Sequence, residues 1–451
     1  EVLNPTTGSG GGFDAVIGNP PYVRQELLGD QKVYFQDHYK VYHGMADLYT
    51  YFFEKGIGLL YREGLFGIIV ANKWMRARYG EPLRKWLKEQ VIDEIIDFGD
   101  LPVFQGATTY PCIFISGKTG KKAETFSAVE IADLNFTNLK DHVNENRKEI
   151  AKADLHDQGW QLLSVKEARL LEKLQQNSVP LGEYVKGKIF YGIKTGLNEA
   201  FVIDEETKNR LIGEDPKSAE VIKPFLAGRD IKRYRKPVSD KYLIFTKRGI
   251  NIDQYPAIKN YLLHFKNKLM PKPKDWNGEK WPGRKPGAYK WYEIQDAIDY
   301  WQEFEKPKIM LPDIAIKPQV TFDRNGYYCV NTAYIIPTED LFLVGILNSR
   351  LIHFYYSSIT STIRGGYMRF IRQYLVQIPI PKKNKENELT FEEIENKVEQ
   401  VLSLNRKLSQ TRISSQREQL QRTIEHTERK VDELVYSLYG LTEEEIGIVE
   451  D

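Results

Sequence analysis

The stretch that decides the fold is Phe13-Asp14-Ala15-Val16-Ile17-Gly18-Asn19-Pro20-Pro21-Tyr22. Its first five residues form a short apolar run bounded by glycines, which predicts a buried strand. The run stops at two consecutive prolines, which fix the backbone and cannot donate hydrogen bonds. In a sheet with helices on both faces, a turn directly after a strand lies at the carboxyl edge, where ligands bind. We therefore expect residues 19–22, hereafter the Asn-Pro-Pro-Tyr turn, to be a functional site.

The residues that follow predict alternating helices and strands. Helical apolar spacing covers residues 47–61, with Asp47 as the candidate N-cap, and residues 79–90 predict a second helix. Four apolar runs predict strands: 65–70, 92–98, 101–104 and 112–115. The last two resemble an antiparallel hairpin at the edge of the sheet. Strands that alternate with helices are typical of a parallel, doubly wound α/β sheet.

The residue composition and pattern change twice along the rest of the chain. A polar, charged stretch at 118–158 is expected to lead away from the sheet and to contain a boundary. Short strands, turns and aromatic-basic mixtures then predict a mixed α+β region. After a charged linker at 382–388, residues 391–439 have an amphipathic helical pattern that ends at Gly440, a candidate C-cap. The predicted regions are 1–150, 159–381 and 382–451, the last of them helical.

Charge is distributed unevenly along the chain. The formal net charge is only +2, yet residues 221–290 hold 18 Lys and Arg against five Asp and Glu, and residues 381–451 hold 11 against 16. Such segregation indicates that the middle of the chain meets a polyanion and that the tail does not. The two cysteines, Cys112 and Cys329, have no neighbouring His in ligand spacing, so we expect no metal site. No apolar run is long enough for a membrane span, and we expect a cytoplasmic protein without a membrane partner.

The Asn-Pro-Pro-Tyr turn has the groups needed to activate a poorly nucleophilic nitrogen. The lone pair of an amino group on an aromatic ring is delocalised into that ring. The amide oxygen of Asn19 and the backbone carbonyl of Pro20 can accept its two hydrogens and favour a pyramidal nitrogen that attacks a methyl sulfonium in line. The prolines stiffen this backbone, and Tyr22 supplies a face for an extruded base.

The chain resembles the amino-methyltransferases that carry an Asn-Pro-Pro-Tyr motif. Residues 13–22 resemble the motif with its strand, and residues 65–70 with the helix after them resemble the next strand and helix. The resemblance implies transfer of a methyl group from S-adenosylmethionine to N6 of a flipped adenine in duplex DNA. It implies catalytic roles for Asn19, Pro20, Pro21 and Tyr22, of which Asn19 and Pro21 also contact the cofactor.

A further stretch resembles the family motif whose aromatic residue packs against the flipped adenine. It consists of Val103-Phe104 followed by residues 112–115. The resemblance therefore implies this role for Phe104, with Tyr110 as the second choice.

The main cofactor-binding motifs of the family are absent from the sequence. No glycine-rich loop follows a strand with an acidic residue after it, and the glycines at 8–12 precede a strand. In this family the cofactor half lies N-terminal to the motif. The implied fold is thus the second half of a doubly wound methyltransferase sheet. We expect a fragment, or one partner of a split enzyme, that is inactive without the missing N-terminal portion or a partner chain.

Residues 180–381 resemble the target-recognition domain of combined restriction-modification enzymes of the type IIG kind. The stretches that carry this resemblance are 191–198, 224–234, 347–350, 364–370 and 378–381, together with 432–441 near the end of the chain. Clustered cations there can neutralise phosphates, and one or two arginines can reach guanine edges. The expected DNA-binding residues are Arg229, Lys232, Arg233, Arg235, Arg364, Tyr367, Arg369 and Arg372.

Two other functions fit the same residues. The chain can be a recognition module whose chemistry resides in a missing segment or partner. It can also be a protein methyltransferase that acts on glutamine, because the turn suits any planar amide or amino nitrogen. The large basic and aromatic C-terminal region favours DNA over a peptide. Residues 303–306 and 312–313 resemble nuclease fragments in the wrong order, so we predict no cleavage by this chain alone.

Overall fold

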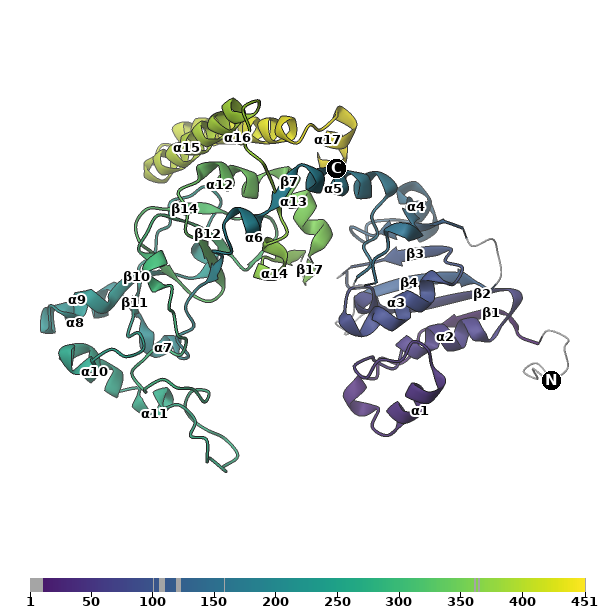
Figure 1. Cartoon of the computed structure of the whole chain (residues 1–451), viewed down its shortest axis with the longest axis horizontal. Helices are drawn as coiled ribbons and strands as arrows, with labels where there is room; N and C mark the ends of the chain where they lie inside the picture. Colours follow the sequence, from purple (N-terminus) through teal and green to yellow (C-terminus); the bar gives the residue numbers. More distant parts are fainter. Residues whose placement is uncertain are drawn as a thin grey trace. The chain divides into compact units, whose positions relative to one another are not determined.

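The computed structural model describes residues 11–99, 101–104, 110–118, 123–157, 159–360, 362–363 and 366–450. Two compact units are present, one formed by residues 1–173 with 361–366 and the other by 174–360 with 367–451 (Figure 1). Arg364 and the glycines at 8 and 10 lie outside the described residues.

The first unit is built on a six-stranded sheet with the order β1-β2-β4-β3-β5-β6. Its strands are β1 (Phe13–Gly18), β2 (Leu60–Ala71), β3 (Glu94–Asp97), β4 (Pro111–Gly117), β5 (Thr125–Glu130) and β6 (Lys148–Ala151). β1 is parallel to β2 and β3 is parallel to β5, while β4 runs antiparallel to both β2 and β3. The expected alternation of strands and helices is therefore present, within a mixed sheet.

The expected edge hairpin is wrong. Residues 101–104 form no strand, and β4 lies inside the sheet between β2 and β3. Cys112 and Phe114 on β4 are fully buried. The polar stretch 118–158 also does not leave the sheet, because it supplies β5 and β6.

Helices cover the sheet on both faces, but unevenly. They are α1 (Gln31–His38), α2 (Thr50–Gly58), α3 (Glu81–Lys88) and α4 (Leu139–Asn146). Phe53 of α2 and Leu83 of α3 belong to the core on one face, and Val143 of α4 packs with Ile96 and Val129 on the other. Asp47 does not cap α2, which begins after Tyr49. Its carboxylate instead accepts a hydrogen bond from the backbone N–H of Gln25 at 3.0 Å.

β1 is not the buried strand that its apolar sequence predicts. Among the described strands it pairs only with β2, and Ile17 is 87% exposed. Val16 packs against the core, but Ala15 and Leu65, which are partners in the register, are both exposed. The side chains on one face of β1 thus pack against the core, whereas those on the other face are exposed.

The second unit combines several small sheets with helices. Its strands are β7 (Ser178–Pro180), β8 (Phe190–Tyr191), β9 (Val202–Asp204), β10 (Ile222–Leu226), β11 (Lys241–Ile244), β12 (Lys308–Pro312), β13 (Ile314–Ala315), β14 (Thr321–Asp323), β15 (Tyr328–Cys329), β16 (Ala333–Ile336), β18 (Tyr367–Arg369) and β19 (Pro379–Pro381). Two four-stranded sheets have the orders β15-β10-β11-β9 and β14-β12-β16-β8. A large apolar core that includes Phe225, Leu243 and Ile335 joins them.

The helices of this unit fall into two groups. Those near the sheets are α6 (Leu181–Tyr184), α7 (Asn198–Phe201), α8 (Glu205–Glu214), α9 (Ser218–Val221), α10 (Pro256–Leu263), α11 (Lys266–Leu269), α12 (Leu341–Asn348), α13 (Arg350–Ile359) and α14 (Arg372–Leu375). The C-terminal group is α15 (Glu388–Gln410), α16 (Ser414–Leu438) and α17 (Glu443–Glu450). α5 (Val165–Gln176) spans the division between the units.

The helical pattern predicted for residues 391–439 is confirmed, and the helices form a hairpin. α15 packs along α16 and on α12, where Phe391 stacks on Phe342 with ring centroids 3.9 Å apart. Gly440 has a φ of 65°, a left-handed conformation that ends α16 as its sequence predicts. In the part of the chain that the structure describes, no helix has the length and apolar character to cross a membrane.

Candidate functional site

The carboxyl edge of the first sheet brings together residues that are far apart in the sequence. β1 and β2 are parallel, so the Asn-Pro-Pro-Tyr turn and Asn72 follow their strands at the same edge. β4 begins at this edge, since Pro111 pairs with Ala71 and Cys112 pairs with Asp97 at the end of β3. The turn, Asn72 and Tyr110 therefore share one edge, as expected for a ligand site in an open sheet.

The turn leaves available the two acceptor oxygens that the predicted chemistry requires. Pro20 is buried, whereas Asn19 and Pro21 are exposed. The Pro21 carbonyl accepts the N–H of Val23 at 3.0 Å, which tightens the turn. Within the described residues, nothing hydrogen-bonds the Asn19 side chain or the Pro20 carbonyl. Both oxygens thus have lone pairs left for a ligand.

Tyr22 lies against a buried neighbour. Its ring centroid is 6.1 Å from that of Tyr49, and the side chain is 37% exposed. Burial, and secondarily the nearby Cys112 thiol, raise the pKa of Tyr22. The Tyr49 hydroxyl is 2.8 Å from that of Tyr79, and burial holds the pKa of Tyr49 well above its ordinary value. Tyr22 is therefore a neutral ring, supported from behind and partly open to solvent.

Asn72 and Asp97 are edge residues that the sequence interpretation missed. The Asn72 amide donates to the Asp97 carboxylate at 2.8 Å, and the N–H of Gly99 donates to the same oxygen at 2.9 Å. Burial raises the pKa of Asp97 in spite of these bonds. The Asn72–Asp97 bond ties the carboxyl ends of β2 and β3 together, and the Gly99 bond holds the Asp97 carboxylate in place. A polar residue at the carboxyl end of each strand, Asn72 directly after β2 and Asp97 as the last residue of β3, was the available signal.

The two candidates for the second aromatic residue differ in position. The Tyr110 carbonyl accepts the N–H of Asn72 at 2.7 Å, and Lys73 lies 5.7 Å from the Tyr110 ring centroid. Phe104 is half-buried in the segment after β3, and in the described part of the chain no aromatic ring contact joins it to Tyr22. The structure therefore brings Tyr110 to the carboxyl edge, and the role of Phe104 stays a prediction.

In the second unit, the cations at 229–235 have different surroundings. Arg229 is exposed and lies 3.9 Å from Asp230, and Lys232 and Arg235 are also exposed. Arg233 instead donates to Glu428 on α16 at 2.8 Å and to the Asn348 carbonyl. Three of the four side chains are thus open to a ligand, whereas Arg233 fastens α16 to the domain.

The cations near residue 370 also face solvent. Tyr367 and Arg369 are exposed on β18, where Arg369 pairs with Ile314 of β13. Arg372 begins α14, is exposed, and donates to the Gly187 carbonyl at 3.2 Å. Arg364 lies outside the described residues.

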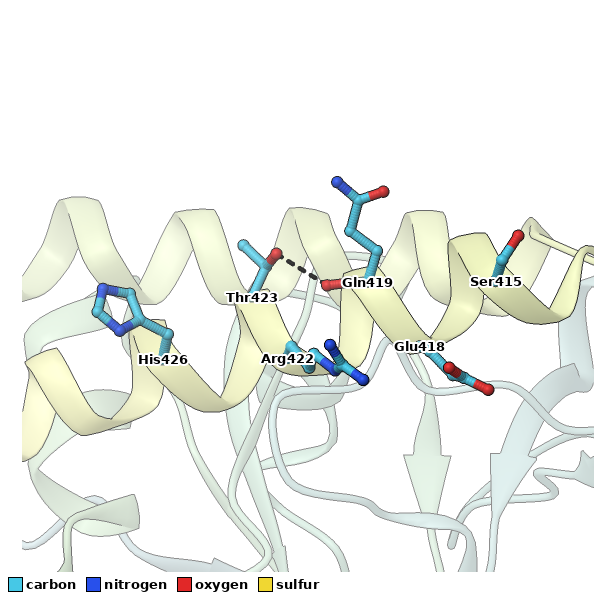
Figure 2. Close-up of a pocket in the computed structure, with 6 residues that line it drawn as sticks. All are labelled: Ser415, Glu418, Gln419, Arg422, Thr423 and His426. Atoms are coloured by element: carbon cyan, nitrogen blue, oxygen red, sulfur yellow. Dashed lines mark hydrogen bonds between the residues drawn. The ribbon is translucent and has the colours of Figure 1, made fainter.

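A hollow on α16 has no comparable chemistry. All of its lining comes from one helix (Figure 2): Ser415, Glu418, Gln419, Arg422, Thr423 and His426. Thr423 donates to the Gln419 carbonyl at 2.9 Å within the helix. These side chains are exposed and of mixed charge, so the hollow is an ordinary helix surface.

No group of His, Cys, Asp and Glu that could hold a metal ion occurs in the described ranges.

Matches to known protein families include residues of both candidate sites. Residues 3–104 match the Eco57I restriction-modification methylase model, which includes the Asn-Pro-Pro-Tyr turn, and residues 223–380 match the TaqI-like C-terminal specificity domain. The chain is a relative of type II DNA methyltransferases. These two matches are consistent with a type IIG-like methyltransferase that has a recognition domain.

Individual type II relatives match along most of this chain. It is 27% identical to the type II methyltransferase M.BstVI of Geobacillus stearothermophilus over 97% of this chain and 75% of that protein. It is 23% identical to the restriction enzyme and methyltransferase RM.Eco57I of Escherichia coli over all of this chain but only 48% of that protein. The type IIL restriction-modification enzyme MmeI, solved in complex with DNA, shares the fold with a TM-score of 0.58 at 16% identity, over 95% of this chain and 54% of that one. The chain thus spans from about half to three quarters of these relatives.

Proposed function

We propose that this chain is the target-base and recognition part of an adenine-N6 DNA methyltransferase of a restriction-modification or phage-defence system. The exposed Asn19 amide and the unpaired Pro20 carbonyl, presented at the carboxyl edge of the sheet, carry this proposal. In this proposal, the protein acts on DNA in the cytoplasm.

The turn activates the acceptor nitrogen by accepting its hydrogens. An adenine amino group has two N–H bonds, and Asn19 Oδ1 and the Pro20 carbonyl oxygen accept one each. This draws the nitrogen lone pair out of conjugation and aims it away from the two acceptors. Tyr22, supported by Tyr49, stacks on the flipped base. Tyr110 or Phe104 packs against its other side.

S-adenosylmethionine supplies the electrophilic methyl group when it is bound. The exposed positions of Asn19 and Pro21, beside the unpaired edge of β1, suit contacts with one side of this cofactor. The rest of its binding surface belongs, in this proposal, to a further part of the sheet.

The open side of β1 supports such a further part. Ile17 and Leu65 are 87% and 56% exposed on a sheet face whose opposite side is well packed. β1 also has a free hydrogen-bonding edge among the described strands, which natural proteins seldom leave uncovered. We infer that a cofactor-binding segment, in the same polypeptide or in a partner chain, pairs with β1 and covers this face. The chain by itself is then inactive.

The second unit supplies DNA recognition in this proposal. Arg229, Lys232 and Arg235 on one segment and Tyr367, Arg369 and Arg372 on another are exposed on a domain that matches a specificity-domain model. Arginines suit phosphates and guanine edges alike.

Transfer of labelled methyl groups from S-adenosylmethionine to duplex DNA tests this function. The chain is assayed alone and together with the proposed cofactor-binding segment, taken from the same polypeptide or from a partner chain. We expect label in DNA only from the combination, and a reduction of at least about a hundredfold in rate for Asn19→Ala. Asn146→Ala, at an exposed residue of α4, is the matched control.

Other outcomes would contradict specific parts of the proposal. Full activity of the chain alone would contradict the role of β1 as a docking edge. DNA binding with no methyl transfer by the combination would favour a non-catalytic recognition module. Label in protein glutamine and not in DNA would favour a protein methyltransferase.

A further inference from the structure

A long irregular loop follows α11 in the second unit (Figure 1). We call residues 271–290 the basic arm. The arm contains six Lys and Arg and two acidic residues. Apart from Arg284 and Tyr289, which are buried, its side chains are exposed or half-buried. The arm belongs neither to the Asn-Pro-Pro-Tyr turn nor to the cations at 229–235 and 367–372. The roles proposed for those residues therefore do not account for the arm.

The base of the arm is closed by backbone hydrogen bonds. The N–H of Arg284 donates to the Met270 carbonyl, and the N–H of Lys272 donates to the Arg284 carbonyl, both at 3.0 Å. The indole N–H of Trp281 adds a third bond, also 3.0 Å long, to the Met270 carbonyl. A Cβ on Gly283 would lie 2.2 Å from that same carbonyl, so only glycine lets the two sides of the neck approach. The two ends of the arm are therefore held together.

Arg284 locks this neck to the body of the domain. Its side chain is only 4% exposed. The guanidinium donates at 2.8–3.2 Å to the backbone carbonyls of Thr195, Leu269, Lys290, Trp291 and Glu293. Burial lowers the pKa of Arg284 to about 10, so the group stays charged at neutral pH. All of its donors are used internally, and it holds the arm without taking part in an outer surface.

The remaining cations of the arm face outward. Lys272 is half-buried, and Lys274, Lys280, Lys285 and Lys290 are exposed. None of these five forms an ion pair with a carboxylate in the part of the chain that the structure describes. Trp276 is 39% exposed and packs edge-on against Trp281 at 4.9 Å. The arm thus combines unpaired positive charge with an aromatic side chain and a fixed base.

We propose that the basic arm binds the phosphate backbone of duplex DNA beside the recognised sequence. This inference rests on the proposed function, which brings DNA to the same domain. Unpaired lysines are point charges that suit phosphates without reading bases. The clamped neck favours this use because an arm that is already ordered loses less conformational entropy on binding. The arm therefore adds affinity that is independent of sequence and sensitive to salt.

The salt dependence of binding tests this proposal. The full chain and the variant Lys272→Gln, Lys274→Gln, Lys280→Gln are titrated with a mixed-sequence duplex over a series of salt concentrations. The slope of log affinity against log salt falls by about 0.9 for each phosphate that a lysine no longer neutralises, and thus by up to about 2.7 for the variant. The matched control is Lys382→Gln, Lys385→Gln, Lys407→Gln, which removes the same charge from exposed sites between β19 and α16.

The possible outcomes distinguish a failure of the proposal for the arm from a failure of the proposed function. A fall in slope in the arm variant, with the control unchanged, supports the proposal. Salt-dependent binding by the unsubstituted chain with equal slopes in both variants would overturn the arm and leave the proposed function standing. No binding of duplex DNA by the unsubstituted chain would overturn both.

Discussion

The two acceptor oxygens of the Asn-Pro-Pro-Tyr turn differ in how firmly the surrounding structure fixes their positions. Pro20 is buried and is followed by a second proline, so its carbonyl has little freedom. The Asn19 side chain is exposed and has no partner among the described residues. We therefore expect the Pro20 carbonyl to be in place before the base arrives, and the Asn19 amide to become ordered with it.

Tyr22 gives a prediction about stacking. If its ring acts as a surface for the flipped base, the hydroxyl is dispensable, and Tyr22→Phe keeps most of the activity. Tyr22→Ala removes a stacking contribution of about 1–3 kcal/mol, which lowers the rate of methyl transfer by a factor between roughly five and roughly 150. Steady-state rates on duplex DNA measure this. Equal reductions in both variants would instead assign the role to the hydroxyl.

Asp432 on α16 gives a prediction about pH. Its carboxylate accepts the N–H of Arg350 at 2.9 Å, but burial outweighs this bond and the nearby arginines and raises the pKa from 3.8 to about 6. The folded state thus holds this proton more tightly than the unfolded state. The stabilisation is complete below the unfolded pKa and is lost as pH rises through about 6.

The variant Asp432→Asn cannot ionise and lacks this dependence. Relative to the unsubstituted chain, we expect its urea midpoint to rise between about pH 4.5 and about pH 7, with other carboxylates cancelling in the comparison. A difference between the two proteins that stays constant over this interval would contradict the assignment.

Among the elements, the C-terminal helical hairpin depends on a close approach to α12. A Cβ on Gly345 of α12 would lie 2.8 Å from a methyl carbon of Ile394 and 2.9 Å from one of Val398, both on α15. The helices pack at this distance because position 345 has no side chain. This contact fixes where the hairpin lies on the domain.

Gly345→Val should therefore separate α12 from α15 at a cost of about 1–3 kcal/mol in the free energy of unfolding. Gly213→Val on α8, where the added side chain meets open space, is the control and should change stability little. Thermal unfolding of both variants measures the difference. A midpoint for Gly345→Val that matches the control would show that the hairpin is not packed at this position.

Elements with local signals could be predicted from the sequence, and those that depend on distant partners could not. α3 and the end of α16 at Gly440 follow from helical spacing and a glycine stop. β4 was placed at the edge because a strand pattern says nothing of its neighbours, which here are β2 and β3. β5 and β6 could not be predicted in a polar stretch because polar, mostly half-buried residues stand between their few apolar ones and dilute the apolar signal.

At the scale of the whole molecule, the sequence predicts the candidate sites but not the residues that surround them. The turn and Tyr22 were identified from the tetrad itself, and the structure adds the support from Tyr49, Asn72 and Asp97, which are distant in sequence. Among the basic residues, only contacts could separate Arg233, which is bound to Glu428, from its exposed neighbours. A count of charges predicted a polyanion partner but not that Arg284 clamps the neck of the basic arm.

The most direct test of the central claim is the identity of the methylated nucleoside. DNA treated with S-adenosylmethionine and with this chain, combined with its cofactor-binding segment, is digested and analysed by mass spectrometry. We expect N6-methyladenine from the unsubstituted chain and none from Asn19→Ala. Methyl groups on cytosine only, or N6-methyladenine that persists undiminished with Asn19→Ala, would contradict it.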